Sequence, residues 1–227
     1  MAGRKNFVAG EILTAADVNS FLMDQSVMVF DDLAARGSAI PSPSEGMVTY
    51  LKSDDQVTVF DGAAYKPVGG LVAVKSVLKT DIFSASVAAG ANVAVTGLSI
   101  THEVQDPANR LIISAFFGAA NSTADIGQIG LAVHDGTGLI AVGDSAGGRT
   151  PVTAGGAVAG TGDQRVVTMP SVTFVHTPGS GSKTYTVRAV NLRDSTRPLE
   201  INRSRSDVNN ESSSRTVSSL VIQEVAV

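Results

Sequence analysis

From residue 71 to residue 227 the chain alternates short runs of β-forming residues with turns rich in Gly, Ser, Asn and Asp, and this alternation constrains the fold more than any other feature. Short strands at fairly even spacing, separated by turn residues, are typical of an antiparallel β-sandwich or jelly roll. We expect strands near residues 72–79, 82–88, 93–100, 109–118, 127–133, 139–143, 165–175, 183–191, 198–202 and 216–226. The predicted fold is therefore mainly β, with a jelly-roll-like antiparallel sandwich at residues 71–227.

Two finer features of this β-domain follow from its turns and its alternation. Residues 171–175 and 184–190 flank a Pro-Gly-Ser-Gly-Ser loop, which predicts that they form one antiparallel hairpin. In the last strand Leu220 and Ile222 are two residues apart, so both should point into the core, with Gln223 on the opposite face. Val221 is apolar on that outer face, which is tolerable if the face meets another subunit.

A short helix with a capping box precedes the β-domain. Thr14 can cap the first turn, and Asp17 stands three residues on, where the box requires an acid or amide. Val18, Phe21 and Leu22 then share one face. So short a helix is unstable alone, and its apolar stripe must dock either on its own chain or on a partner. The candidate residues for anchoring to a partner are Leu13, Thr14, Asp17, Val18, Phe21 and Leu22.

The segment at residues 31–70 predicts a small β-hairpin neck. We expect a second short helix at residues 31–37, ended by Gly37, and then a hairpin of residues 47–51 and 56–60 onto which Tyr65 folds back. Two strands alone are marginally stable, so this unit also needs support from neighbours. The predicted domains are an N-terminal anchoring helix segment at 1–30, the neck at 31–70 and the sandwich at 71–227.

Composition excludes several classes of partner. The net charge of −4 argues against a nucleic-acid surface, and no run is long and apolar enough to insert into a membrane. The N-terminus has no apolar core of a signal peptide, so we expect none. Charged residues make up only 17% of the chain, below the usual quarter, which hints that some surface is buried between subunits.

The sequence shows no convergent site for catalysis, metal or cofactor. The chain has no cysteine, and its three histidines are isolated. His102, with Glu103 and Asp106, is the one near-cluster, and we expect these three to be polar residues at the end of a strand. If the chain is a trimer and a histidine lies on its threefold axis, the three copies of that histidine would supply three metal ligands. Residues 135–138 read as a turn and not as a calcium loop, and the glycine-rich residues 154–156 lack the lysine and the following helix of a phosphate loop. We therefore expect no enzyme, no catalytic residue, no cofactor and no metal.

Several phrases of the sequence carry a resemblance to a known class of proteins. Residues 7–19, running on to 25–30, resemble the N-terminal segment of many tailed-bacteriophage fibre and minor tail proteins. Residues 45–50 and 60–65 are similar to the same proteins, in which an aromatic residue, often Trp, closes the hairpin; here it is Tyr65. The β-domain resembles a phage fibre domain at residues 79–84, 95–99, 143–150, 201–204 and 215–225.

This resemblance implies a virion structural protein without catalysis: a homotrimeric fibre attached to other tail or baseplate proteins. A head-decorating fibre is an alternative. A second alternative is a receptor-binding adhesin that recognises a host surface glycan. Its binding loops would be residues 121–125, 147–149 and 208–214, because loops on a rigid scaffold carry recognition. A polysaccharide-cleaving spike is less favoured, because the sandwich has no tryptophan and only one tyrosine, Tyr185.

Overall fold

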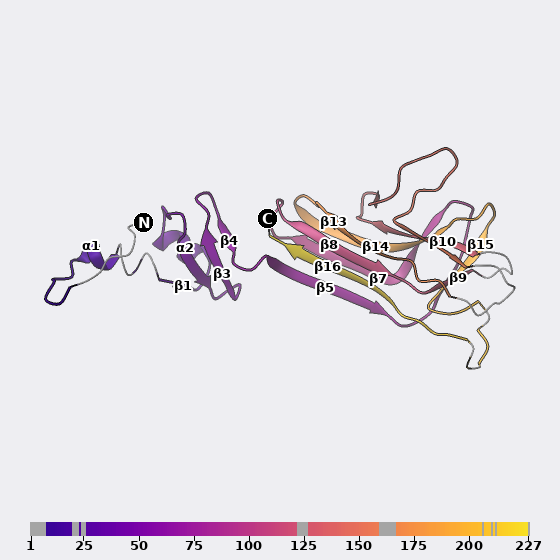
Figure 1. The fold of residues 1–227 in the computed structure, drawn as a ribbon, viewed down its shortest axis with the longest axis horizontal. Helices are drawn as coiled ribbons and strands as arrows, with labels where there is room; N and C mark the ends of the chain where they lie inside the picture. Colours follow the sequence, from indigo (N-terminus) through magenta and orange to yellow (C-terminus); the bar gives the residue numbers. More distant parts are fainter. Residues whose placement is uncertain are drawn as a thin grey trace. The chain divides into compact units, whose positions relative to one another are not determined.

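The computed structural model describes residues 8–19, 23, 26–121, 127–158, 167–205, 207–209, 211 and 213–226. Contacts between residues divide the chain into two compact units, Met1–Gly70 and Leu71–Val225. Both units are built on β-sheet (Figure 1), so the predicted mainly β fold with an antiparallel sandwich is confirmed. The further separation of residues 1–30 from residues 31–70 stays a prediction.

Within its described residues, the first unit carries two short helices and one four-stranded sheet, in the order β1-β2-β3-β4. Its elements are α1 (Ala15–Val18), β1 (Met28–Phe30), α2 (Leu33–Ala39), β2 (Val48–Leu51), β3 (Gln56–Phe60) and β4 (Tyr65–Pro67). β2 and β3 form the predicted hairpin, β1 adds parallel to β2, and β4 adds antiparallel to β3. The predicted helix end at Gly37 is wrong, because α2 runs to Ala39 and closes its last turn with a hydrogen bond from the Ile40 N–H to the Arg36 carbonyl.

An arginine lies at the centre of this unit. Arg36, on α2, is only 9% exposed, and its guanidinium lies 3.7 Å from the ring centroid of Tyr65. The same group donates a hydrogen bond of 3.1 Å to the Thr58 hydroxyl on β3. Tyr65 in turn packs on Phe60, with ring centroids 5.1 Å apart. Tyr65 therefore folds back onto the hairpin as predicted, and it does so over a buried cation.

The second unit is a sandwich of two main sheets with a smaller third one. One sheet has the order β13-β8-β16-β5, and the other has the order β11-β10-β14-β7 with β12 paired to β10. A three-stranded sheet, β6-β15-β9, adds to the core. The strands are β5 (Leu71–Lys79), β6 (Phe83–Val87), β7 (Asn92–Val104), β8 (Arg110–Phe116), β9 (Ala119–Asn121), β10 (Gly127–His134), β11 (Leu139–Ile140), β12 (Ala154–Val158), β13 (Ser171–His176), β14 (Gly181–Asn191), β15 (Arg197–Ile201) and β16 (Ser218–Val225).

The last strand lies inside its sheet, between β8 and β5. Leu220 and Ile222 are both fully buried in the core between the sheets, as predicted, while Val221 and Gln223 face outward and are half-buried. A strand with neighbours on both sides satisfies its backbone hydrogen bonds on both edges. β16 therefore completes the sheet.

The predicted hairpin of residues 171–175 and 184–190 is wrong. β13 pairs with β8, whereas β14 lies between β10 and β7 in the opposite sheet. Gly179 in the loop between them and Gly181 at the start of β14 have φ values of +70° and +86°, which L-residues rarely adopt. These glycines let the chain cross from one sheet to the other, where a hairpin would have stayed in one sheet.

β12 is a strand that the sequence does not suggest, because it reads Ala-Gly-Gly-Ala-Val. Two glycines permit close packing here: a Cβ on Gly156 would lie 2.6 Å from the Thr168 hydroxyl, and one on Gly130 of β10 would lie 2.6 Å from a Val152 methyl. A run in which the sequence predicts no strand therefore forms an edge strand, with a glycine where a side chain would clash with Thr168.

Candidate functional site

The N-terminal segment forms the predicted capping box. The Thr14 hydroxyl accepts a hydrogen bond of 3.1 Å from the Asp17 N–H, and the Asp17 carboxylate accepts one of 3.2 Å from the Thr14 N–H. α1 buries none of its residues, Leu13 is 53% exposed, and Val18 is half-buried. Phe21 and Leu22 lie outside the described residues. The role of these residues in anchoring stays a prediction.

The near-cluster around His102 does not form a metal site. His102 points into the sandwich, Glu103 points outward, and the Asp106 carboxylate caps the Ala108 N–H at 2.8 Å. Across the described part of the chain, the histidines and acidic residues form no group of three that could hold a metal ion. Because His102 is only 1% exposed inside the core, it is not available to an axis between subunits.

The partner of His102 is Glu224, which the sequence analysis missed. The His102 Nε2 atom lies 2.7 Å from the Glu224 carboxylate, which also accepts hydrogen bonds from the Asn109 amide at 2.7 Å and the Gln105 N–H at 2.9 Å. Burial raises the pKa of Glu224, but the hydrogen bonds from Asn109, His102 and Gln105 outweigh it and hold the pKa below its ordinary value. The carboxylate therefore ties β16 to β7 and to the turn before β8.

Two other polar segments serve the fold. Asp135 closes the turn between β10 and β11, where its carboxylate accepts hydrogen bonds from the Thr137 N–H and hydroxyl and from the Gly138 N–H. Burial opposes the ionised form, but these bonds lower the pKa of Asp135 to about 2. Residues 135–138 therefore form a turn, as predicted.

In the loop after β15, Arg203 pairs with Glu200 at 2.8 Å and with Asp207 at 3.2 Å.

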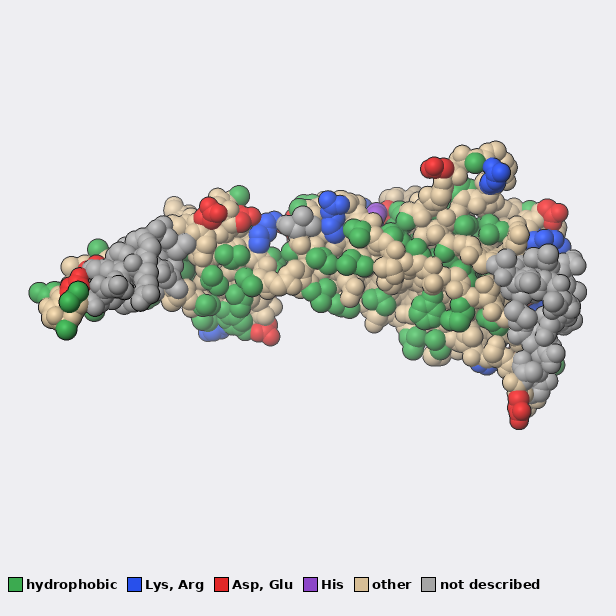
Figure 2. Space-filling view, in the orientation of Figure 1, with side chains coloured by type: hydrophobic (Ala, Val, Ile, Leu, Met, Phe, Trp, Pro, Cys, Tyr) green, Lys and Arg blue, Asp and Glu red, His purple; other side chains and the backbone are tan. Residues whose placement is uncertain are grey.

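The outer face of the sheet β13-β8-β16-β5 carries no charge over three rows of side chains that cross all four strands. We call this surface the uncharged sheet face. The register of the strands gives its rows: Val175, Ile112, Gln223 and Val74; Thr173, Ser114, Val221 and Ser76; Ser171, Phe116, Ser219 and Leu78. Val175, Val74 and Leu78 are 53–63% exposed. Figure 2 shows hydrophobic side chains spread over the sandwich between groups of charged side chains nearer its ends.

The outer face of the opposite sheet is hydrophilic. On β7 and β14, Ser99 hydrogen-bonds Thr186 at 3.1 Å and Thr101 hydrogen-bonds Thr184 at 2.9 Å. The exposed Glu103 extends the row. We call this surface the hydroxyl face. The uncharged sheet face mixes six apolar side chains with five hydroxyls and one amide, whereas the paired side chains of β7 and β14 named here are all hydroxyls, so the two faces are suited to different surroundings.

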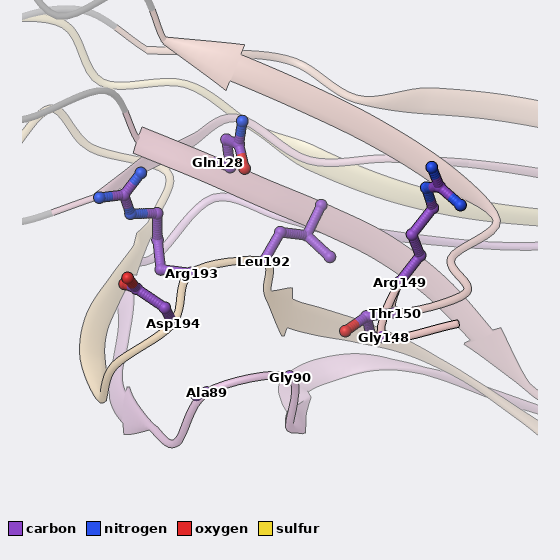
Figure 3. Close-up of a pocket in the computed structure, with 9 residues that line it drawn as sticks. All are labelled: Ala89, Gly90, Gln128, Gly148, Arg149, Thr150, Leu192, Arg193 and Asp194. Carbon is purple, nitrogen blue, oxygen red and sulfur yellow. The ribbon is translucent and has the colours of Figure 1, made fainter. Parts of the chain in front are cut away.

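A pocket of about 570 Å³ lies among loops of the sandwich (Figure 3). Its lining comes from the turn between β6 and β7, the start of β10, the loop before β12 and the loop after β14: Ala89, Gly90, Gln128, Gly148, Arg149, Thr150, Leu192, Arg193 and Asp194. Figure 3 shows the Leu192 side chain between Gln128 and the Thr150 hydroxyl, with the two arginines on opposite sides. The volume lies in the range of small-molecule sites.

The walls of this pocket are held by the buried Asn191. Its side-chain amide donates to the Val87 carbonyl at 2.8 Å and to the Ser195 carbonyl at 2.8 Å, and its side-chain oxygen accepts from the Arg193 N–H at 3.0 Å. The Gly90 N–H also bonds the Asn191 carbonyl at 3.0 Å. One fully buried side chain therefore joins the two turns that form one wall of the pocket.

The pocket includes one of the three loops proposed from the sequence for recognition. Gly148 and Arg149, from the predicted loop at residues 147–149, line it. Residues 122–125 of the predicted loop at residues 121–125 lie outside the described residues, and the described residues of 208–214 do not line the pocket. The sequence analysis missed the loop at residues 192–194, whose Arg-Asp pair after a strand that ends in Asn was the available signal.

Comparison with known proteins yields weak likenesses to solved structures. No family model matches the chain, and no curated protein matches it. It is similar to the structure of infectious bursal disease virus Gt strain, with 12% identity, a TM-score of 0.36, and coverage of 87% of this chain and 55% of that chain. It is also similar to the T13 particle of infectious bursal disease virus, with 11% identity, a TM-score of 0.38, and coverage of 81% and 44%.

The chain thus spans about half the length of the solved structures that it matches. At such low TM-scores the likeness carries no argument about fold family or function. In the described part of the chain, no helix is long and apolar enough to cross a membrane.

Proposed function

We propose that the chain is a non-enzymatic structural protein of a bacteriophage particle, a homotrimeric fibre that attaches to other tail or baseplate proteins and exposes its sandwich. The observation that carries the proposal is the uncharged sheet face. The solvated face of an antiparallel sheet ordinarily carries polar residues, and Val175 and Val74 in the first row and Leu78 in the third are exposed apolar residues that depart from that pattern. The occupant of the face is a second copy of the chain.

The area of the face indicates how much of the interface it supplies. Strands about 4.8 Å apart and alternate residues about 6.7 Å apart give the three rows a surface of roughly 400 Å². A standard interface buries about 800 Å² on each partner. The face therefore supplies about half of that area, and the exposed apolar residues Val8 and Ile12 of the N-terminal segment are further candidates for contact.

The test places a charge in the middle of the uncharged sheet face. Light scattering on the purified full chain should give a mass three times that of the 23.2-kDa subunit. Val221→Asp should shift the protein to monomer, because a carboxylate would be buried without a partner. Thr101→Asp, a matched change on the hydroxyl face, should leave the trimer intact. A monomeric wild-type protein, or a Val221→Asp trimer, contradicts the proposal.

The pocket favours a second function, recognition of a host surface glycan by the same fibre. It combines a cavity with polar side chains of both charges. Incubation with surface polysaccharide separates the readings. Retention of the polysaccharide without release of reducing ends supports an adhesin, and release of reducing ends indicates a polysaccharide-cleaving spike. If neither is observed, the chain acts as a scaffold alone.

A further inference from the structure

We infer that the pocket lined by Arg149, Arg193 and Asp194 binds an acidic sugar residue of a surface polysaccharide, an inference that rests on the proposed recognition function. The charged groups of the pocket are not engaged with one another. The Arg193 guanidinium and the Asp194 carboxylate form no ion pair or hydrogen bond with any described residue, although they are adjacent in sequence. The guanidinium of Arg149 makes one long hydrogen bond of 3.4 Å, to the Ala146 carbonyl.

The sign of the charge selects an acid. Two guanidinium groups and one carboxylate give the pocket a net positive charge, in a chain whose net charge is −4. Guanidinium groups bind carboxylate or phosphate oxygens through paired N–H donors, and such charge-assisted hydrogen bonds are stronger than neutral ones. An anionic group is therefore the part of a ligand that each of these arginines is suited to hold.

The remaining lining suits the hydroxyl groups and the ring of a sugar. The Asp194 carboxylate accepts hydrogen bonds, and the Gln128 amide and the Thr150 hydroxyl offer both donors and acceptors. Leu192 and Ala89 supply an apolar surface for the C–H groups of the ring (Figure 3). No aromatic side chain is among the lining residues, so the contact with each sugar should be weak, and repeated sites on a trimer would raise the avidity.

The pocket is also held in shape before any ligand binds. Asn191 fixes the backbone of Arg193 and of the turn that carries Gly90, and the Thr150 hydroxyl lies so near that turn that a Cβ on Gly90 would stand 3.2 Å from it. Residues whose backbone is fixed in this way lose less conformational entropy on binding than those of a free loop.

The experiment titrates the full chain with glucuronate, galacturonate and N-acetylneuraminate, with glucose 6-phosphate and with glucose, and follows binding by saturation-transfer NMR. At least one carboxylate sugar should bind more tightly than glucose. Binding of glucose 6-phosphate as well would show that the arginines hold an anion of either kind. The double variant Arg149→Gln and Arg193→Gln should weaken binding of the acid by about tenfold per arginine, the loss expected for one charge-assisted hydrogen bond.

A matched control variant shows whether the effect is specific to the arginines of the pocket. Arg110→Gln removes an exposed arginine that hydrogen-bonds Thr177 and does not line the pocket, so it should not change binding. The inference fails if none of the acids binds, if glucose binds as tightly as the acids, or if the double variant binds them unchanged. Polysaccharide retained equally by wild type and double variant would leave the recognition function standing while removing this pocket from it.

Discussion

Three buried polar side chains, Glu224, Asn191 and Asn202, each join segments that are far apart in the sequence. Asn202, at a φ of +64°, donates to the Lys79 carbonyl at 2.9 Å and accepts from the Ser218 hydroxyl at 2.6 Å. Each side chain replaces the water that its neighbours would otherwise bind. Leaving such groups unpaired costs more than the bond itself contributes, so these residues are sensitive points of the sandwich.

The first prediction concerns the pH dependence of stability at Glu224. Its pKa in the folded chain lies below the ordinary value of 4.5. A carboxylate with a depressed pKa stabilises the fold fully above its unfolded pKa, and that contribution is lost as the pH falls through the folded pKa. We expect the free energy of unfolding, measured by urea titration, to fall from about pH 4.5 downward.

Glu224→Gln is the control for this effect. It removes the titrating group while keeping the shape, so the variant should be less stable than wild type at pH 7, and the difference should shrink as the pH falls below 4.5. Glu224→Ala should cost about 3–5 kcal/mol at pH 7, because it leaves His102 and Asn109 buried without their partner. A difference between wild type and Glu224→Gln that stays constant with pH would contradict the assignment.

The second prediction concerns Arg36 in the first unit. Arg36→Met keeps the apolar stem but removes the cation over Tyr65 and the hydrogen bond to Thr58. We expect a loss of about 1–3 kcal/mol, from one cation–π contact and one charged hydrogen bond. Hydrogen exchange should show faster exchange of the amides of β2 and β3, with those of β16 unchanged. Equal acceleration in both units would show that they do not unfold separately.

At the scale of elements, β16 illustrates how one strand serves two environments. Its inner side chains, Leu220 and Ile222, lie in the core with no exposure, and its outer side chains, Val221 and Gln223, lie on the uncharged sheet face. Burial of an apolar side chain stabilises the fold in proportion to the area removed from water. The two faces of the strand should therefore respond differently to truncation.

The third prediction tests that difference. Ile222→Ala should cost roughly 2–5 kcal/mol, because it removes buried carbons and leaves a cavity in the core. Gln223→Ala, one residue away on the other face, should cost well under half as much. Denaturant unfolding of both variants at one protein concentration gives the comparison. Equal costs would mean that the outer face is as tightly packed as the core.

At the scale of the whole molecule, the chain combines two units of different character. Unit Met1–Gly70 carries exposed apolar residues beside a capped helix, whereas unit Leu71–Val225 carries the uncharged sheet face, the hydroxyl face and the pocket. The surfaces proposed for anchoring, assembly and recognition therefore lie on different residues. Substitutions in one of them should leave the others intact.

The fourth prediction separates anchoring from folding. Deletion of residues 1–30 should leave the β-domain folded, with an unchanged far-ultraviolet circular dichroism signal for its strands, because none of the described strands of the sandwich pairs with the described part of that segment. The truncated chain should fail to join particles when it is co-expressed with the other virion proteins, as judged by sedimentation. The anchor lies elsewhere if the truncated chain sediments with particles as the full chain does.

The sequence by itself determined the features that depend on neighbours along the chain. The capping box of Thr14 and Asp17, the hairpin of β2 and β3, and the inward direction of Leu220 and Ile222 follow from local spacing. Glu224 stands two residues beyond Ile222, and the structure shows it buried on the same inner face, which was not predicted from the sequence. Local hydrogen bonds and the alternation of side chains along a strand depend on residues that are close in the sequence, so they can be predicted from it.

Only the tertiary structure decided which distant segments meet. It placed β13 and β14 in opposite sheets, because the positive-φ glycines between them let the chain cross, and it made a strand of a glycine-rich run because only small residues fit beside Thr168. It also paired His102 with a carboxylate 122 residues away and brought Arg149 and Arg193 to one pocket. Such contacts depend on strand register and sheet order, and long-range pairings of this kind have no local signature in the chain.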